Sequence, residues 1–137
     1  MSSSNVCDYA GVAVLHGRSI LLSKRIETHF GEKVSFGGYW SIFAGALDPN
    51  EDHKACAVRE LFEESGIVSP IEDLHFIKSI PQKKSLFHIY YYKVEELVIP
   101  KLNFEHTESG WFDIDSLDVF TDKIDLKLMN LIKKHVH

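Results

Sequence analysis

The acidic residues between Gly45 and Ile67 carry the clearest chemical signal in this chain. Four glutamates and one arginine are spaced along this stretch: Glu51, Arg59, Glu60, Glu63 and Glu64. On a helix with 3.6 residues per turn, the last three glutamates share one face. Like charges at these spacings repel, so the helix gains no stability from them. A bound divalent cation would remove that cost, because hard cations such as Mg2+ take carboxylate oxygens as ligands.

The residues around these acids predict a helix that holds them in place. Pro49 and Asn50 interrupt regular structure, the helix begins near Asp52, and Ser65 and Gly66 end it. The apolar side chains of this helix fall on the face away from the glutamates: Ala55, Val58, Leu61 and Phe62. We therefore expect the apolar face to pack against a core and to hold the carboxylates rigidly.

The rest of the chain predicts an α/β fold. Residues 8–15 and 19–25 form two apolar strands, residues 40–44 form a short strand that leads into Gly45, and an apolar segment follows around residues 74–80. Further strands are predicted at 86–94 and 111–114, a polar flexible loop at 26–38, and a helix at 124–132 from the spacing of its apolar residues. Strands on both sides of one central helix, with a second helix at the end, favour a mixed sheet between helices.

Length and composition narrow the class of protein. A chain of 137 residues predicts one domain, residues 1–137, with a single core. A net charge of −5 argues against broad electrostatic binding to nucleic acid, and it suits either an acidic, metal-recruiting pocket or simple solubility. No apolar run is long enough to span a membrane, and no signal peptide is visible. Two cysteines make no disulfide framework, so the expected location is the reduced cytoplasm.

The stretch from Gly45 to Ile67 resembles the Nudix box, the signature of the Nudix hydrolase family. The family pattern is G-x5-E-x7-R-E-U-x-E-E-x-G-U, where U is a bulky aliphatic residue. Every specified position matches: Gly45, Glu51, Arg59, Glu60, Leu61, Glu63, Glu64, Gly66 and Ile67. The complete pattern argues against the alternative of an ordinary helix with a solvated acidic face. The resemblance implies a Nudix α/β/α sandwich with a central mixed sheet, in which the box forms a catalytic loop-helix-loop.

The resemblance also implies a metal site. Glu60 and Glu64 would be the primary ligands of Mg2+, or of Mn2+ in its place, and Glu63 would share the cluster. The backbone carbonyl of the residue before the box, here Ala44, would complete the site. Many family members have glycine at that position, but a carbonyl ligand does not depend on the side chain. The implied reaction is hydrolysis of a phosphoanhydride bond, for which metal ions neutralise charge and activate water.

The remaining catalytic residues have alternative interpretations. Arg59 is expected to form an ion pair with Glu51 that locks the loop to the helix, although an ordinary surface salt bridge would look the same in sequence. The general base could be a box glutamate or an acid in a downstream loop. In that loop Glu105 is favoured as a fourth metal ligand or base, with Glu108 as its substitute and a solvated loop acid as the alternative for both.

Residues upstream of the box suggest substrate contacts. Arg25 is the candidate cation near the substrate phosphates, where relatives place one, against ordinary exposure as the alternative. Trp40, with Tyr39 and Phe36, could stack on a base, although an aromatic residue beside a core strand is more often part of the packing. The family run W-x-F/L-P-G-G reads here as residues 40–45 without the proline and the first glycine, so the substrate loop has its own shape.

The sequence leaves several substrates and functions open. Pro81, beyond the box, tilts toward the ADP-ribose branch, so the expected substrates are a nucleotide sugar such as ADP-ribose, a dinucleotide or a (deoxy)nucleoside triphosphate. One alternative is a non-catalytic Nudix-fold sensor that binds a nucleotide. Another is a Nudix-fold isomerase of isoprenoid diphosphates, which would use Cys7 or Cys56 in a cleft. A homodimer is also compatible with the sequence.

Overall fold

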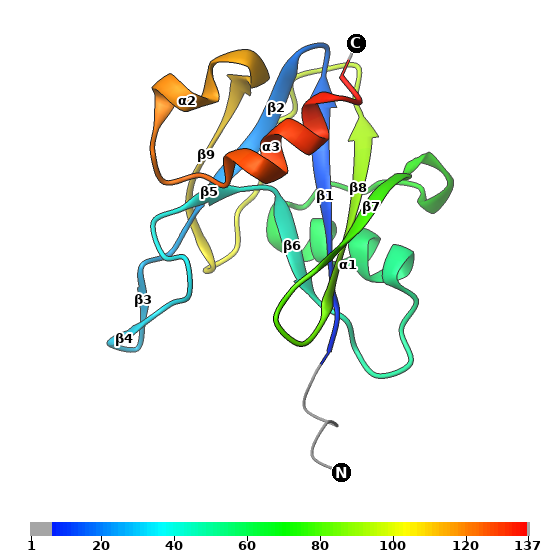
Figure 1. Ribbon diagram of the computed structural model, residues 1–137, viewed down its shortest axis with the longest axis vertical. Coiled ribbons are helices and arrows are strands. Elements are labelled where there is room, and N and C mark those ends of the chain that lie inside the picture. The colour runs from blue at the N-terminus through cyan, green and yellow to red at the C-terminus, as the bar shows by residue number, and fades with distance from the viewer. Residues whose placement is uncertain (1–6, 137) are drawn as a thin grey trace.

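Residues 7–136 are described by a computed structural model, in which helices lie on both faces of a mixed sheet (Figure 1). The strands are β1 (Tyr9–His16), β2 (Ser19–Arg25), β3 (Thr28–His29), β4 (Glu32–Lys33), β5 (Trp40–Ser41), β6 (Phe43–Ala46), β7 (His75–Pro81), β8 (Leu86–Lys93) and β9 (His106–Asp113). The helices are α1 (His53–Ser65), α2 (Leu117–Phe120) and α3 (Leu126–Lys133), with short 3-10 helices at Ile71–Asp73 and Ile114–Ser116. This arrangement confirms the predicted α/β class.

The sheet is organised around β1. One edge of β1 runs parallel to β8, and β7 continues the sheet beyond β8 in the antiparallel sense. The other edge pairs first with β6, over residues 9–12, and then with β2, over residues 14–16. β9 lies antiparallel to β2 on its far side. This topology places the ends of β2, β6 and β9 in the same region of the sheet.

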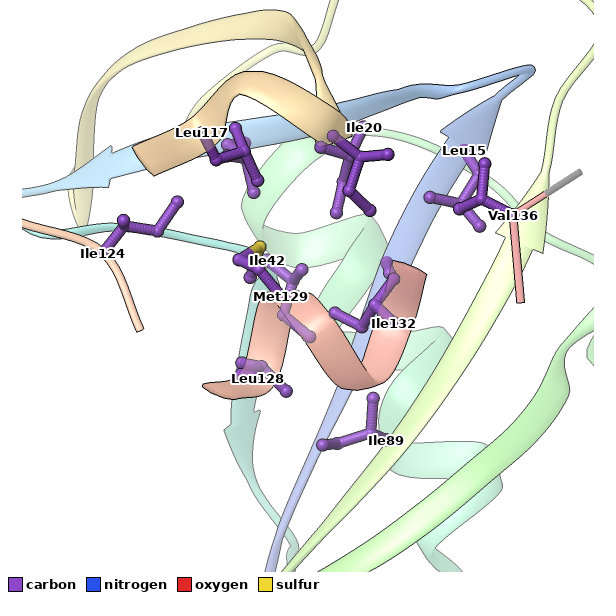
Figure 2. Close-up of a cluster of buried hydrophobic side chains, with 13 residues drawn as sticks. Leu15, Ile20, Ile42, Ile89, Leu117, Ile124, Leu128, Met129, Ile132 and Val136 are labelled. Carbon is purple, nitrogen blue, oxygen red and sulfur yellow. The ribbon is translucent and has the colours of Figure 1, made fainter. Parts of the chain in front are cut away.

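Each face of the sheet carries its own core, because successive side chains of a strand point to opposite faces. Val12 and Val14 of β1 contribute to the core under α1, whereas Ala13 and Leu15 contribute to the core under α3. Figure 2 shows the second of these cores, where α3 lays its buried side chains onto the sheet: Leu128, Met129 and Ile132. The sheet is therefore anchored from both sides, and α1 rests on a fixed surface.

Local sequence sets the ends of α1. The side chain of Asp52 accepts hydrogen bonds from the backbone N–H groups of Lys54, at 3.1 Å, and Ala55, at 3.4 Å, and so caps the first turn. Gly66 ends the helix with a φ of 74°, a left-handed conformation that costs glycine little. These are the boundaries that the sequence predicted.

Several predicted elements differ from the structure. The loop at 26–38 contains the small β3–β4 hairpin, and the strand expected at 111–114 is the end of β9, which begins at His106. The last helix begins at Leu126, because Ile124 forms a bridge with Trp40 instead of a helical turn. Among residues 7–136, no helix combines the length and the apolar character needed to cross a bilayer.

The assignment of helix faces was wrong at Phe62 of α1, which was expected in the core but is 54% exposed. Glu64 lies beside Glu60, as expected, and is only 1% exposed. Apart from this glutamate, the buried side chains of the helix are three small ones and one leucine: Cys56, Ala57, Leu61 and Ser65. The glutamate therefore points between the helix and the sheet, where only a polar partner or a cation can compensate its charge.

Candidate active site

Two glutamates of α1, Glu60 and Glu64, contact the backbone of β6 where the box begins. The backbone N–H of Ala44 donates a hydrogen bond to Oε1 of Glu64 at 3.1 Å. The carboxyl group of Glu60 packs against Gly45 so closely that a Cβ at that position would overlap it. Glycine at position 45 is therefore needed because of what approaches it from the helix. Glu60 and Glu64, called the carboxylate pair from here on, lie side by side in this confined space, with a hydrogen bond between their carboxyl groups.

Burial raises the pKa of both members of the carboxylate pair to about 7. For Glu60 the neighbouring charge of Glu64 adds to this effect, and the carboxyl–carboxylate hydrogen bond between them raises its pKa further. For Glu64 the charge of Glu105 acts in the same direction, while the Ala44 N–H works against it. Two buried, neighbouring carboxylates repel each other when both are ionised. Their oxygens are suitable ligands for a hard divalent cation, which would take the place of the shared proton.

Only some of the expected ligands of such a cation lie close together in the structure. Among residues 7–136, no three side chains of His, Cys, Asp or Glu are gathered into a preformed metal centre. Glu63, the third expected ligand, has a side chain that is 50% exposed and accepts a hydrogen bond from Arg59 at 3.1 Å. The carboxylate pair and the nearby backbone of Ala44 are thus the donors already brought together.

Arg59 connects the loop, the helix and the sheet. Its guanidinium donates two hydrogen bonds of 2.9 Å to the two oxygens of Glu51 and one of 3.0 Å to the carbonyl of Ala46. The remaining nitrogen donates to Glu60 at 2.8 Å as well as to Glu63. The hydrogen bonds from Arg59 hold the pKa of Glu51 at about 2, so this acid stays ionised. The expected ion pair between Arg59 and Glu51 is present, and it ties the loop before α1 to the helix.

A buried serine and histidine complete the surroundings of Glu64. Nε2 of His106 lies 3.3 Å from Oε1 of Glu64, and Nδ1 of the same ring lies 2.8 Å from Oγ of Ser23. Burial lowers the pKa of His106 to about 4, so its ring is neutral. Sequence reasoning missed both residues. The available signals were a serine among the apolar residues of β2 and a histidine directly after Glu105.

The two downstream acids occupy different environments. Glu105 is half-buried, accepts a hydrogen bond from the side chain of Asn103 at 3.3 Å, and lies close enough for its charge to raise the pKa of Glu64. Glu108 is exposed and forms an ion pair of 3.6 Å with Lys24. Lys24 follows Ser23 along β2, so the two side chains point to opposite faces of the sheet. Glu108 is therefore directed away from the carboxylate pair.

The expected substrate contacts are also separated by the sheet. Arg25 is half-buried, donates to the carbonyl of Ser35 at 3.0 Å, and contributes positive charge that lowers the pKa of Glu64. Trp40 instead packs edge-on against Phe112 and Phe120, at ring centroid distances of 5.3 and 5.2 Å, beside the core under α3. The structure thus brings Arg25 near the carboxylate pair and places Trp40 in the packing of the other face.

Cys56 lacks the properties of a catalytic thiol. Its side chain is fully buried, and burial raises the pKa of the thiol to about 12. Its sulfur lies 3.7 Å from the carbonyl oxygen of Gly45, within the packing between helix and sheet. A protonated, inaccessible thiol is a poor nucleophile or acid, which weighs against the isomerase alternative for this cysteine.

The departure from the family run at Ala44 is accommodated by β1. Gly11 is the register partner of Ala44, and a Cβ added to Gly11 would come within 2.8 Å of the Ala44 methyl group and 3.0 Å of the Phe43 carbonyl. The methyl group of Ala44 therefore fills space that glycine leaves on the neighbouring strand. β6 keeps its place in the sheet without the first glycine of the run.

The layered sheet and the box loop-helix-loop together define a Nudix-type α/β/α sandwich. Residues 8–132 match the NUDIX domain, so the chain belongs to the Nudix hydrolase family. It is 32% identical over 106 residues to NAD-capped RNA hydrolase NudC of Chromobacterium violaceum, covering 77% of this chain and 37% of that protein. It is 29% identical over 123 residues to putative hydrolase 111R of Invertebrate iridescent virus 3, covering 84% of this chain and 66% of that protein. The chain thus spans less than two thirds of either relative.

Solved structures share the same fold. The NUDIX domain of Shewanella oneidensis NrtR, determined with ADP ribose, superposes with a TM-score of 0.74 at 14% identity, over 98% of this chain and 92% of that one. An Ap4A hydrolase of C. elegans superposes with a TM-score of 0.69 at 20% identity, over 95% of each chain. At these identities the likeness shows the architecture alone.

Proposed function

We propose that this protein hydrolyses a phosphoanhydride bond in a nucleoside diphosphate linked to another moiety, with Mg2+ or Mn2+ as cofactor. The observation that carries this proposal is the carboxylate pair, buried between α1 and β6 with the pKa of both acids raised to about 7. Burying two neighbouring acids costs stability, and a catalytic cation is a reason to keep them together.

In this proposal the chain's own residues bind and orient the reactants. Glu60, Glu64 and the carbonyl of Ala44 would hold the cation, and Arg59 keeps Glu60 in place through its 2.8 Å hydrogen bond. A bound divalent ion neutralises phosphate charge and lowers the pKa of a coordinated water. Glu105 is the proposed base, and it would accept the proton of the attacking water on its carboxylate.

Two features support a nucleotide as the substrate. Arg25 supplies positive charge on the side of the sheet where the carboxylate pair lies, as a phosphate-binding residue would. Beside Glu105, the ring of Phe104 is 64% exposed and stacks on His29 at 5.0 Å, which offers a flat surface to a base. The similar NudC acts on NAD-capped RNA, and the NrtR domain was determined with ADP ribose, so dinucleotides and nucleotide sugars come first in a screen.

The test is a hydrolysis panel with ADP-ribose, NAD, diadenosine tetraphosphate and deoxynucleoside triphosphates. Each is incubated with Mg2+ or Mn2+, and the products are separated by chromatography. We expect turnover of at least one substrate that stops with EDTA and falls more than about 100-fold in Glu60→Gln and Glu64→Gln. Glu72→Gln, an exposed glutamate beyond the box, is the matched control and should be unaffected.

The outcomes of this panel separate the enzyme from the sensor. Binding of a nucleotide without hydrolysis in either metal would support the non-catalytic sensor and refute the proposal. Wild-type turnover in both glutamine variants would show that hydrolysis takes place without the carboxylate pair, and would refute the assignment of the site.

A further inference from the structure

Three buried polar side chains from three different elements meet at Glu64. Ser23 of β2 is 0% exposed, Glu64 of α1 is 1% exposed, and His106 of β9 is 9% exposed. They form a line in which Ser23 Oγ lies 2.8 Å from His106 Nδ1, and His106 Nε2 lies 3.3 Å from Glu64 Oε1. The box pattern contains only the last of the three, so the other two reach the site through tertiary structure.

The hydrogen bonds of this line have one consistent direction when Glu64 is ionised. A carboxylate only accepts hydrogen bonds, so Nε2 of His106 carries the proton and donates to Oε1. The neutral ring then accepts at Nδ1, and the hydroxyl of Ser23 donates to it. A hydroxyl can donate or accept, so the tautomer is set by Glu64; the hydrogen bond from Ser23 satisfies Nδ1 and holds the ring in the orientation that faces Glu64.

Oε1 of Glu64 is fully engaged in this arrangement. It accepts one hydrogen bond from His106 and another, at 3.1 Å, from the backbone N–H of Ala44. The ring of His106 is itself held edge-on by Phe43, with a centroid distance of 5.5 Å and an interplanar angle of 72°. Neither of these two donors contacts the other oxygen, Oε2. Oε2 is therefore available to Glu60, the other member of the carboxylate pair, and to a ligand.

A bulge in β9 places His106 in this line. Arg25 pairs with His106 and Lys24 pairs with Glu108, so Thr107 is an extra residue between two consecutive pairs. Without the extra residue, side chains two apart on a strand would point to the same face. The bulge lets His106 face Glu64 while Glu108 faces Lys24, and bulges commonly re-aim a side chain in this way beside active sites.

We propose that Ser23 and His106 are positioning residues that fix the carboxylate of Glu64, so that Oε1 is held by the protein and Oε2 is presented to the catalytic cation. This inference rests on the proposed function for the identity of the ligand. It extends that function to two residues outside the box, and it predicts that metal affinity depends on a histidine that does not itself ligate the metal.

The test compares His106→Leu, which removes the donor, with His106→Gln, whose amide can replace Nε2 as a donor. Mn2+ affinity is measured without nucleotide, from the paramagnetic resonance signal of free Mn2+, and kcat and KM are measured at saturating Mn2+. We expect His106→Leu to weaken Mn2+ binding by about 10- to 100-fold and to lower kcat with KM nearly unchanged. His106→Gln should recover most of the affinity.

The chain offers a matched control in the Ser79–His88 pair. Ser79 Oγ lies 2.6 Å from His88 Nδ1 across β7 and β8, and His88 is 6% exposed, so this is a second serine–histidine pair whose histidine is as buried as His106, although Ser79 is only half-buried. His88→Leu should lower the melting temperature while leaving the Mn2+ dissociation constant within about twofold of wild type. A general loss of stability is thereby separated from a loss of metal affinity.

The outcomes distinguish this inference from the proposed function. A His106→Leu protein that binds Mn2+ like wild type, or a wild-type protein that binds no Mn2+, overturns the positioning role. If His106→Leu does not fold, Ser23→Ala decides the same question, with an expected loss of affinity of about threefold or more and wild-type affinity as the refuting result. Mn2+ binding that depends on His106 in a protein that hydrolyses no nucleotide would refute the enzyme and keep the positioning pair.

Discussion

Replacing Gly45 by alanine tests the contact between the box glycine and Glu60. A Cβ at position 45 would overlap the carboxyl group of Glu60. Of the three carboxyl atoms, Oε2 lies farthest from the added Cβ, at 2.6 Å. An ordinary contact needs at least 3.4 Å, so even this atom must retreat by roughly 0.8 Å. The obstacle is the end of a flexible side chain, so the carboxyl group moves and the backbone stays.

The expected effects on activity and on stability differ strongly. A displacement of about 1 Å at a catalytic group can cost about 100-fold in rate, and we expect a loss of kcat of that order. The strained Glu60 rotamer costs about 1 kcal/mol. Alanine recovers about 0.4–1 kcal/mol by restricting the unfolded chain, so the melting temperature should change by less than about 3 °C.

The assay combines turnover with Mn2+, the Mn2+ dissociation constant and the melting temperature of Gly45→Ala. Gly11→Ala is the contrasting variant, because its Cβ would meet the Phe43 carbonyl and the Ala44 methyl group instead of a movable carboxylate. A Gly45→Ala protein with wild-type turnover and Mn2+ affinity would refute the placement of Glu60 in the metal site. A large loss of stability would show that the backbone gives way before the side chain.

Three further predictions follow from neighbouring contacts. The pKa of each member of the carboxylate pair is raised to about 7 from an ordinary 4.5, so the folded, metal-free protein binds more protons than the unfolded chain in that range. Its melting temperature should therefore fall as the pH rises from about 6.5 to 8, above the range in which the lowered pKa of His106 has the opposite effect, and a flat profile there would contradict the pairing. Arg59→Lys loses the two-pronged contact with Glu51 and should lower the melting temperature by about 4–8 °C. An unchanged melting temperature would show that the pair is an ordinary surface salt bridge. Gly11→Ala should destabilise the fold by about 1–3 kcal/mol in urea unfolding, and adding Ala44→Gly should recover part of the loss; equal stability of the single and double variants would exclude the contact.

The sequence predicted the features that depend on local chemistry. The ends of α1 followed from Asp52 as a cap and from Gly66 in a left-handed conformation, both of which act within one helical turn. The ion pair between Arg59 and Glu51 followed from the box pattern, because that pattern already encodes a contact between loop and helix. The apolar runs of β1 and β2 gave the first two strands for the same reason, since an uninterrupted apolar run predicts a buried strand.

Features that depend on distant pairing were beyond a single sequence. The positions of His106 and Glu108 are decided by one extra residue in the register between β2 and β9, which no local pattern reveals. Helical periodicity also failed at Phe62, which it places in the core, and it does not reveal that Glu64 is buried, because it assumes that polar side chains face water. Here the charged residue is turned inward and the aromatic residue outward, which local propensity alone would penalise.

This inversion is itself an indication of function. A carboxyl group that is 1% exposed costs the fold several kcal/mol unless its charge is compensated, and a well-packed apolar residue at that position would be cheaper. The compensation at Glu64 is incomplete in the protein alone, since its pKa remains raised despite hydrogen bonds from Ala44 and His106. Under the proposed function, a cation bound beside the second oxygen of this inward-facing acid would supply the stabilisation that the two donors at the first oxygen leave incomplete.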